Sequence, residues 1–138
     1  MSADLLPSRV LPELTAENKF FWTSGADGVL RVLRCSDCGY YNHPPYPCCA
    51  RCLSRRVAPA VMTGRGAVYS FTVNYQQWMP STPPYVLALV ELDEQEGVRI
   101  FTNLVGCEPA EVAIGDRVEV VFRLYDDVWL PLFRKSAS

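Results

Sequence analysis

The stretch Cys35-Ser36-Asp37-Cys38 and, after ten intervening residues, Cys49-Ala50-Arg51-Cys52 decides how the first half of this chain folds. Each Cys-x2-Cys pair can bend into a knuckle that points two thiolates at one point, so two knuckles supply the four sulfur ligands of a tetrahedral zinc site. Such a site leaves no position open for water, and it holds structure instead of activating a nucleophile. We predict one structural zinc ion, bound by Cys35, Cys38, Cys49 and Cys52.

Two nearby residues compete for a place in this site. Cys48 directly precedes Cys49, and a Cys-x3-Cys spacing is also tolerated, but the equal spacing of the two pairs favours Cys49. His43 is the single histidine of the chain and lies between the knuckles, yet four thiolates already complete the site. Cys107 lies far along the chain, and we expect it to be a buried, small apolar side chain.

Length and composition bound the rest of the chain. Its 138 residues are 49% hydrophobic, which is enough for one core domain and a small satellite. Residues 1–6 lack the basic segment and long apolar run of an export signal, so we expect a cytoplasmic protein whose clustered cysteines bind metal. Because no apolar run approaches the about 20 residues that cross a bilayer, no membrane association is expected.

We expect a short helix before the ribbon. Thr15 can cap a segment that begins at Ala16, and Ser24-Gly25 can end it. The adjacent aromatic residues Phe20-Phe21-Trp22 cover more than one face of so short a helix, which must dock on something to be stable. Packing within its own domain and contact with another subunit both remain open.

The fold class predicted is mainly β, in three parts. Residues 1–28 form an N-terminal helical segment, residues 29–63 a small zinc ribbon with a strand at 29–34, and residues 64–138 a five-stranded barrel of the OB type. Gly64-Arg65-Gly66 lacks the spacing of a phosphate loop and is expected to be a hinge between ribbon and barrel. The alternation of apolar residues places the barrel strands at 68–75, 85–92, 98–105, 117–124 and 128–133.

Residues 76–84 contain Trp78, Met79 and three prolines, and we expect a stiff loop between the first two barrel strands. Tyr69, Phe71 and Tyr75 share one face of the first strand. OB barrels often stack single-stranded bases on such aromatic residues, but a barrel strand turns one face inward, so core packing is the favoured role. The net charge of −2 also opposes a phosphate backbone, and no nucleic-acid partner is expected.

Residues 38–90 contain four arginines and no acidic residue. The arginines can offset the charge of the zinc site, since four thiolates on one divalent cation sum to −2. Alternatively, they can face an anionic ligand. The four are Arg51, Arg55, Arg56 and Arg65.

No catalytic pair is evident. With His43 as the single histidine, neither a Ser-His-Asp nor a Cys-His arrangement has a base to spare. Asp93, Glu94 and Glu96 are clustered acids, but they lie where a solvated hairpin turn is expected, over residues 93–97. We therefore expect that the chain is not an enzyme on its own.

The order of these motifs resembles a bacterial family that joins a rubredoxin-like zinc ribbon to an acyl-CoA-associated OB fold. Members of that family are small companions of thiolase-like enzymes that act on acyl-CoA thioesters, and their catalytic residues lie on the partner. The resemblance covers nearly the whole chain. It rests on residues 35–39, 44–45, 47–52, 64–73, 84–92, 102–106 and 114–118.

Within this family, residues 73–80, 91–97 and 129–133 look most like the domain that accompanies the retro-aldolase of bacterial steroid and cholesterol side-chain degradation. The resemblance implies a non-catalytic accessory subunit of a hetero-oligomer. Its thiolase-like aldolase partner would bind most of the acyl-CoA and cleave a steroid acyl-CoA side chain to a steroid ketone and propionyl-CoA. The alternatives are an accessory subunit of a different thiolase-like acyltransferase and a single-stranded nucleic-acid-binding protein.

The resemblance also suggests roles for particular residues. The zinc ribbon would anchor the complex, and the loop around Trp78 would contact the partner near the entrance of its active site. The candidates for binding CoA phosphates are Arg51, Arg55 and Arg56. The candidates for the partner interface are Phe20, Phe21, Trp22, Trp78 and Met79.

Overall fold

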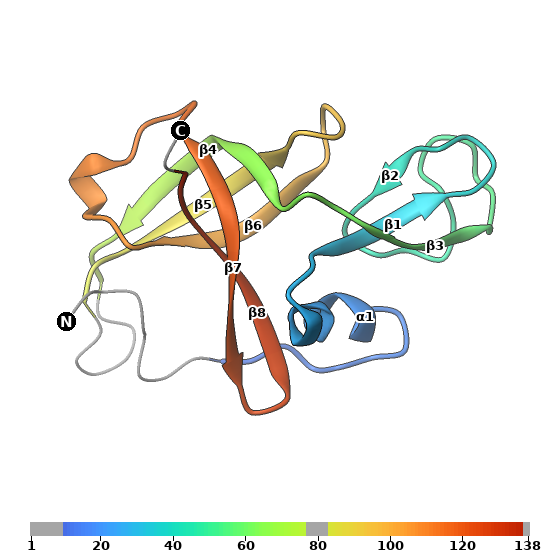
Figure 1. Cartoon of the computed structure of the whole chain (residues 1–138), viewed down its shortest axis with the longest axis horizontal. Helices are drawn as coiled ribbons and strands as arrows, with labels where there is room; N and C mark the ends of the chain where they lie inside the picture. The colour runs from blue at the N-terminus through green and yellow to red at the C-terminus, as the bar shows by residue number, and fades with distance from the viewer. Residues whose placement is uncertain (1–9, 77–82, 137–138) are drawn as a thin grey trace.

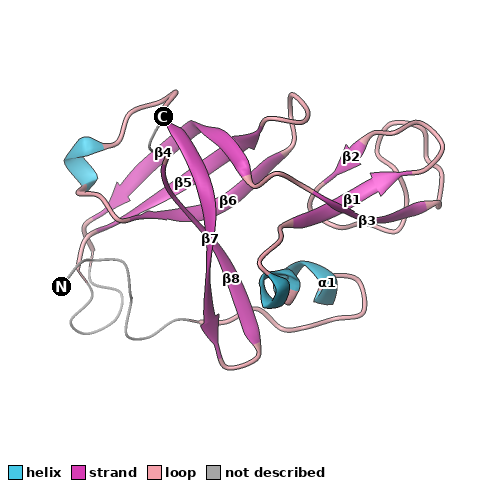
Figure 2. Cartoon of the chain, in the orientation of Figure 1, coloured by secondary structure: helices cyan, strands magenta, loops and turns pink. Residues whose placement is uncertain are grey.

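The structure, a computed structural model, describes residues 10–76 and 83–136. This part of the chain forms a three-stranded sheet and a closed five-stranded barrel, with a short helical segment beside both (Figures 1 and 2). The prediction of a mainly β protein, with a zinc ribbon followed by an OB-type barrel, is confirmed. Within the described ranges, every helix is too short to cross a bilayer.

The ribbon is an antiparallel sheet in the order β2-β1-β3. Its strands are β1 (Arg31–Cys35), β2 (Tyr41–Asn42) and β3 (Val57–Val61). The sequence did not predict β3, because Pro59 interrupts its apolar run. Pro59 is tolerated because β3 is an edge strand, where a residue without an N–H can face away from the neighbouring strand.

The barrel closes in the order β4-β5-β6-β8-β7, with β7 pairing back to β4. All pairs are antiparallel except β6 with β8, and a 3-10 helix, η2 (Pro109–Glu111), lies between β6 and β7. The five strands occur where alternation predicted them, with ends shifted by a few residues. They are β4 (Arg65–Asn74), β5 (Tyr85–Leu92), β6 (Arg99–Val105), β7 (Arg117–Tyr125) and β8 (Val128–Lys135).

Strand β5 shows how the barrel core forms. Its even-numbered residues are buried and its odd-numbered residues are partly exposed, as expected for a strand with one face inward. The buried side chains of β5 pack with those of the neighbouring strands into one apolar core. Among the least exposed members of this core are Val68, Val86, Val90, Leu92, Ile100, Val118 and Phe133.

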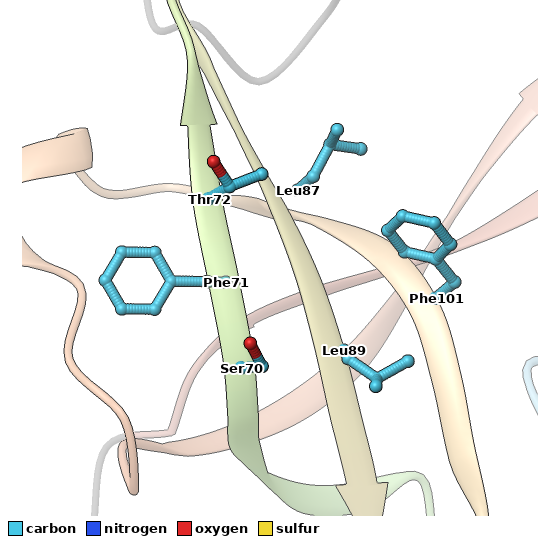
Figure 3. Close-up of a pocket in the computed structure, with 6 residues that line it drawn as sticks. All are labelled: Ser70, Phe71, Thr72, Leu87, Leu89 and Phe101. Atoms are coloured by element: carbon cyan, nitrogen blue, oxygen red, sulfur yellow. The ribbon is translucent and has the colours of Figure 1, made fainter.

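Strand β4 carries a β-bulge that reverses part of its expected facing. The register with β5 shifts between Val68 and Ser70, so Tyr69 is an extra residue in the ladder. Beyond the bulge, Phe71 packs against the core and its ring points away from the side chains of the neighbouring strands (Figure 3). Tyr69 and Tyr75 are 47% and 72% exposed. The prediction that these tyrosines pack in the core is therefore wrong.

The glycines expected to form a hinge also have a packing role. Gly66 lies within β4, where a Cβ atom would come 2.2 Å from the carbonyl oxygen of Glu91. Gly64 precedes β4, and a Cβ atom there would come 2.5 Å from a methyl carbon of Val120. Both positions need glycine because neighbouring strands approach too closely for a side chain.

The helical segment is shorter than predicted. It consists of α1 (Lys19–Trp22) and a 3-10 helix, η1 (Ser24–Asp27). The predicted cap at Thr15 is made: Thr15 Oγ1 accepts the Asn18 N–H at 3.2 Å, and Asn18 Oδ1 accepts the Thr15 N–H at 2.8 Å. This reciprocal pair closes a turn over residues 16–18, and the α-helix proper begins only at Lys19.

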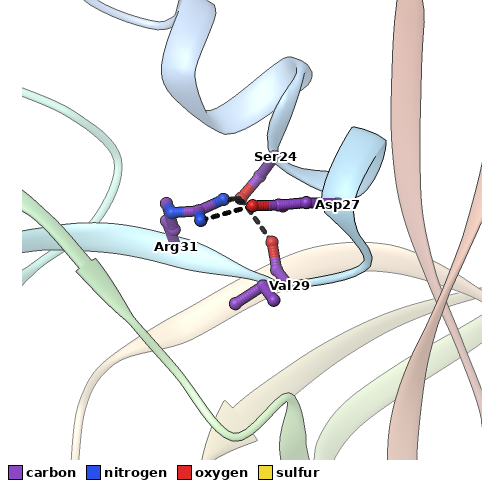
Figure 4. Close-up of polar contacts among 4 residues, drawn as sticks. All are labelled: Ser24, Asp27, Val29 and Arg31. Carbon is purple, nitrogen blue, oxygen red and sulfur yellow. Dashed lines mark hydrogen bonds and ion pairs between the residues drawn. The ribbon is translucent and has the colours of Figure 1, made fainter.

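A cluster of polar contacts ties η1 to the first ribbon strand. The Arg31 guanidinium donates to both carboxylate oxygens of Asp27, at 3.0 and 2.7 Å, and to Ser24 Oγ at 3.2 Å (Figure 4). The Ser24 hydroxyl in turn donates to the Val29 carbonyl. Hydrogen bonding to Arg31 lowers the pKa of Asp27, so the ion pair persists at neutral pH.

The turn between β5 and β6 holds the ribbon against the barrel. The Gln95 side chain donates to the Tyr41 carbonyl at 2.9 Å and accepts the Tyr41 N–H at 2.8 Å, as a neighbouring strand would. Glu94 accepts the Thr63 N–H at 2.7 Å. This turn was expected to be solvated, but two of its side chains satisfy backbone groups of the ribbon and of the segment that follows it.

Candidate metal centre and surrounding surface

Four cysteine sulfurs converge at one end of the ribbon. Cys35 ends β1 and Cys38 follows in the next turn, whereas Cys49 and Cys52 lie in the loop between β2 and β3. The four Sγ atoms all lie within 4.8 Å of one another, and the pairs Cys35–Cys52 and Cys38–Cys49 are each 3.6 Å apart. A tetrahedron with Zn–S bonds of about 2.3 Å separates its sulfurs by about 3.8 Å, so the cluster fits one zinc ion.

The two knuckles are built by the same backbone turn. The N–H of Gly39 donates to the Cys35 carbonyl at 2.9 Å, and the N–H of Leu53 donates to the Cys49 carbonyl at 2.9 Å. Gly39 and Leu53 both have left-handed backbone angles, with φ of 79° and 66°. The sequence indicates this turn at Gly39 but not at Leu53, because leucine rarely adopts the left-handed region.

The pKa values of the thiols show why the cluster needs a cation. Burial raises the pKa of Cys49, but backbone N–H groups of Cys52 and Arg51 donate to its sulfur and bring the pKa down to about 6. The Ser54 N–H lowers the pKa of Cys52, but burial and the neighbouring thiols raise it to about 12. A charged thiolate makes it harder for the neighbouring thiols to ionise, and a divalent cation at the centre offsets this repulsion.

The other candidates lie outside this cluster. Cys48 is not among the four converging sulfurs, and Cys107 is partly buried against the barrel core. The His43 ring packs against Phe21 with 4.7 Å between the ring centroids. Burial lowers the pKa of His43 to about 4, so the imidazole is neutral at physiological pH.

The three ribbon arginines differ in their surroundings. Arg56 pairs with Asp37 at 2.9 Å, and the Arg51 guanidinium lies 5.8 Å from the centre of the Tyr40 ring. Arg55 is exposed and borders a groove of about 410 Å³ between the helical segment and the ribbon, which is otherwise largely apolar. Of the three, Arg55 is the one placed beside a hollow that could receive a ligand.

The predicted interface residues differ in how far they are buried. Phe21 is 4% exposed and belongs to the barrel core, so it cannot serve as a docking residue. Phe20 and Trp22 are half-buried and pack against that core. Trp78 and Met79 lie outside the described residues.

Sequence reasoning missed one prominent surface residue. Phe101 is 71% exposed in the middle of β6, where it alternates with the buried residues Ile100 and Thr102. Its neighbours on the outward face are Arg99 and Asn103, so an aromatic residue stands in the polar phase of the strand. This break in the alternation of apolar and polar residues could have identified Phe101 as an exposed aromatic residue from the sequence.

Comparisons with known proteins match both β structures. The chain matches the ChsH2 rubredoxin-like zinc ribbon domain over residues 22–58 and the ChsH2 C-terminal OB-fold domain over residues 60–123. Together with the four converging cysteines, the first match confirms the prediction of one structural zinc ion.

Three relatives carry informative names. The chain is 38% identical to the 3-oxo-4,17-pregnadiene-20-carboxyl-CoA hydratase alpha subunit of Mycobacterium tuberculosis, over 90% of this chain but only 40% of that protein's length. It is 29% identical to the benzoylsuccinyl-CoA thiolase subunit BbsA of Thauera aromatica, over 79% of this chain and 76% of that one. The solved structure of an Ltp2-ChsH2(DUF35) aldolase contains a chain that is 36% identical and superimposes with a TM-score of 0.80, over 91% of this chain and 98% of that chain.

We predict that Cys38→Ser and Cys49→Ser lose zinc and soluble expression together, because metal binding and ribbon folding are one equilibrium. Cys48→Ser is the matched control and should keep one zinc ion per chain. Zinc measured by inductively coupled plasma mass spectrometry, together with soluble yield, tests this. Zinc loss in Cys48→Ser with retention in Cys49→Ser would show that Cys48, and not Cys49, is the ligand.

The buried His43 should make stability depend on pH. Its pKa is about 4 in the folded chain and about 6.5 when unfolded, so the unfolded state binds more protons between these values. The contribution is complete above pH 6.5 and is lost as the pH falls toward 4, by about 3 kcal/mol in all. Urea unfolding across this range should show a steeper decline for the natural chain than for His43→Gln. Parallel curves would contradict the prediction.

Proposed function

Since the chain belongs to the family in which a ChsH2 rubredoxin-like zinc ribbon precedes a ChsH2 OB-fold domain, we propose that it is the non-catalytic accessory part of a thiolase-like acyl-CoA enzyme. The observation that carries this proposal is the likeness to the ChsH2(DUF35) aldolase structure, which extends through both the ribbon and the barrel. The likeness to a subunit of benzoylsuccinyl-CoA thiolase supports the thiolase-like nature of the partner. The partner forms a hetero-oligomer with this chain and carries the reactive groups.

The non-catalytic role is supported by how the reactive side chains of the described residues are used. The four clustered thiolates are saturated by one zinc ion, which leaves no open coordination position. His43 is neutral and packed against Phe21. Asp93 of the acidic turn pairs with Arg117, and hydrogen bonding to that arginine lowers the pKa of Asp93. Each of these groups is therefore engaged in the metal site, in packing or in an ion pair.

We propose that the partner cleaves a steroid acyl-CoA side chain by a retro-aldol reaction, releasing a steroid ketone and propionyl-CoA. Two likenesses support this choice: one relative is named for a pregnadiene-carboxyl-CoA substrate, and the matched structure is named an aldolase. The likeness to BbsA favours a second candidate, in which the partner is a thiolase-like acyltransferase acting on a different acyl-CoA. Both candidate functions give this chain the same accessory role.

Within the complex, we propose that the ribbon anchors the partner and that its arginines meet the phosphates of CoA. Arg55 is the leading candidate because it is exposed at the border of a largely apolar groove, which Glu17 also lines. Arg56 can contribute only if it shares its guanidinium with Asp37. The Arg51 guanidinium lies 5.8 Å from the centre of the Tyr40 ring, a contact that holds it near that ring without using its N–H donors.

We predict that co-expression with a thiolase-like protein encoded beside this chain yields a stable complex that cleaves a steroid acyl-CoA. The separated chain should have no such activity, because the reactive groups of the described residues are already engaged in the metal site, in packing or in ion pairs. Size-exclusion chromatography and thioester turnover by each fraction test this. Steady turnover by the purified chain alone would refute the non-catalytic role, and recovery of two independent monomers would refute the accessory role.

We predict that Arg55→Glu raises the KM for the acyl-CoA about 10-fold, because a charge-assisted hydrogen bond to phosphate is replaced by repulsion. The kcat should change little, since the reacting bond of the substrate is held by the catalytic groups of the partner and not by Arg55. Arg65→Glu makes the same charge change on β4 and serves as the control. An unchanged KM in Arg55→Glu would leave the arginines with the simpler role of offsetting the charge of the zinc site.

A further inference from the structure

The outer surface of β4, β5 and β6 carries three large apolar side chains, Leu87, Leu89 and Phe101. The register places Ser70, Leu89 and Phe101 side by side across the three strands, with Thr72, Leu87 and Asn103 in the adjacent row. We call these six residues the Phe101 face. OB folds commonly receive their ligands on the face formed by their second and third strands, which here are β5 and β6.

The Phe101 face is accessible and hollowed. Phe101 is 71% exposed, and its direct cross-strand partner Leu89 is half-buried. The side chains of Leu87, Leu89 and Phe101 lie near one another across β5 and β6 (Figure 3), bordering a hollow of about 420 Å³. Large apolar side chains gathered in this way on a surface usually mark a contact with another molecule.

Phe101 also joins this face to a second hollow. That hollow, of about 410 Å³, lies between the helical segment and the ribbon loop, and Trp22, His43 and Pro45 are among the residues lining it. A single partner could therefore contact the barrel, the helical segment and the ribbon around one aromatic side chain. This continuity also gives the half-buried Trp22 a place at the edge of the same surface.

The charges around the face indicate the chemistry of its occupant. The six residues of the face are all uncharged, Glu17 lines the second hollow, and Arg99 at the border pairs with Glu91 at 3.2 Å while lying 3.7 Å from the centre of the Tyr69 ring. A nucleic acid would need cations that can neutralise phosphates, but Arg99 is already paired and Glu17 would repel them. An uncharged, apolar protein surface matches the face better.

The size of the face favours a different protein over a second copy. The two rows of the face span about 13 Å along the strands, and three strands span about 14 Å, so the face covers roughly 200 Å². A stable interface buries about 800 Å² on each partner. Two copies joined through this face alone would fall short, whereas a larger partner can cover the second hollow as well.

We propose that the Phe101 face and the adjoining second hollow are the docking surface for the thiolase-like subunit, which inserts an uncharged apolar segment against Phe101. This inference rests on the proposed function, because that function supplies the partner. Phe101 acts as the central anchor, and the hydroxyl groups of Ser70 and Thr72 form part of the polar rim.

Phe101→Asp tests this surface in complex with the purified thiolase-like subunit. Truncating a central aromatic anchor typically weakens binding about 30-fold or more, and a buried carboxylate should add to that loss. Leu124→Asp is the matched control, because Leu124 is also an exposed apolar residue, 53% exposed, but lies on β7. Zinc content and thermal unfolding of each variant verify the fold, and Leu89→Asp provides a second variant on the same row. Affinity is measured by biolayer interferometry.

The outcomes separate this inference from the proposed function. Weakened binding by Phe101→Asp or Leu89→Asp, with unchanged zinc content and unchanged binding by Leu124→Asp, supports the docking surface. If the natural chain and both variants bind equally well, the surface is wrong and the proposed function stands. If the natural chain does not bind the subunit, both are wrong. Binding of a fluorescent single-stranded oligonucleotide, or self-association lost in Phe101→Asp without loss of subunit binding, would also overturn the docking surface.

Discussion

The convergence of four thiolates on one zinc ion is the constraint on which the rest of the structure depends. The ribbon has only three strands, one of them two residues long, and its cysteines lie at the end of β1 and in the connecting loops. Zinc closes the loop between β1 and β3, so that Cys35 and Cys52 meet although they are 17 positions apart in the sequence. In small modules of this kind, the free energy of metal binding is the free energy of folding.

Once the ribbon is closed, polar contacts fix its position on the barrel. Gln95 completes the hydrogen bonding of Tyr41 from a turn 54 residues away, and Arg31 links β1 to Asp27 of the helical segment. These contacts, together with Phe21 in the shared core, make the ribbon, the helical segment and the barrel into one continuous surface. A docking partner therefore meets a preformed shape, which reduces the conformational entropy lost on binding.

This arrangement suits a subunit that supports chemistry performed elsewhere. Among the described residues, the four clustered cysteine thiolates bind a structural zinc ion. The single histidine, His43, is neutral and packed. The surface has three hollows that a partner could contact: one at the barrel face around Phe101, a second beside Trp22, and a groove bordered by Arg55. These features agree with the proposed roles, in which the partner subunit carries out the reaction and this zinc-stabilised chain positions the partner.

The sequence by itself determined the metal site and the order of the five barrel strands, because both depend on residues close along the chain. The spacing of Cys35, Cys38, Cys49 and Cys52 encodes two knuckles, and alternation encodes each barrel strand. Facing and burial were decided by the tertiary structure. One extra residue at Tyr69 reverses which side chains point inward, and the burial of Phe21 depends on strands that arrive far later in the chain. The facing of a strand changes with a single inserted residue, and long-range contacts leave no periodic trace in the sequence, so local patterns could not predict either.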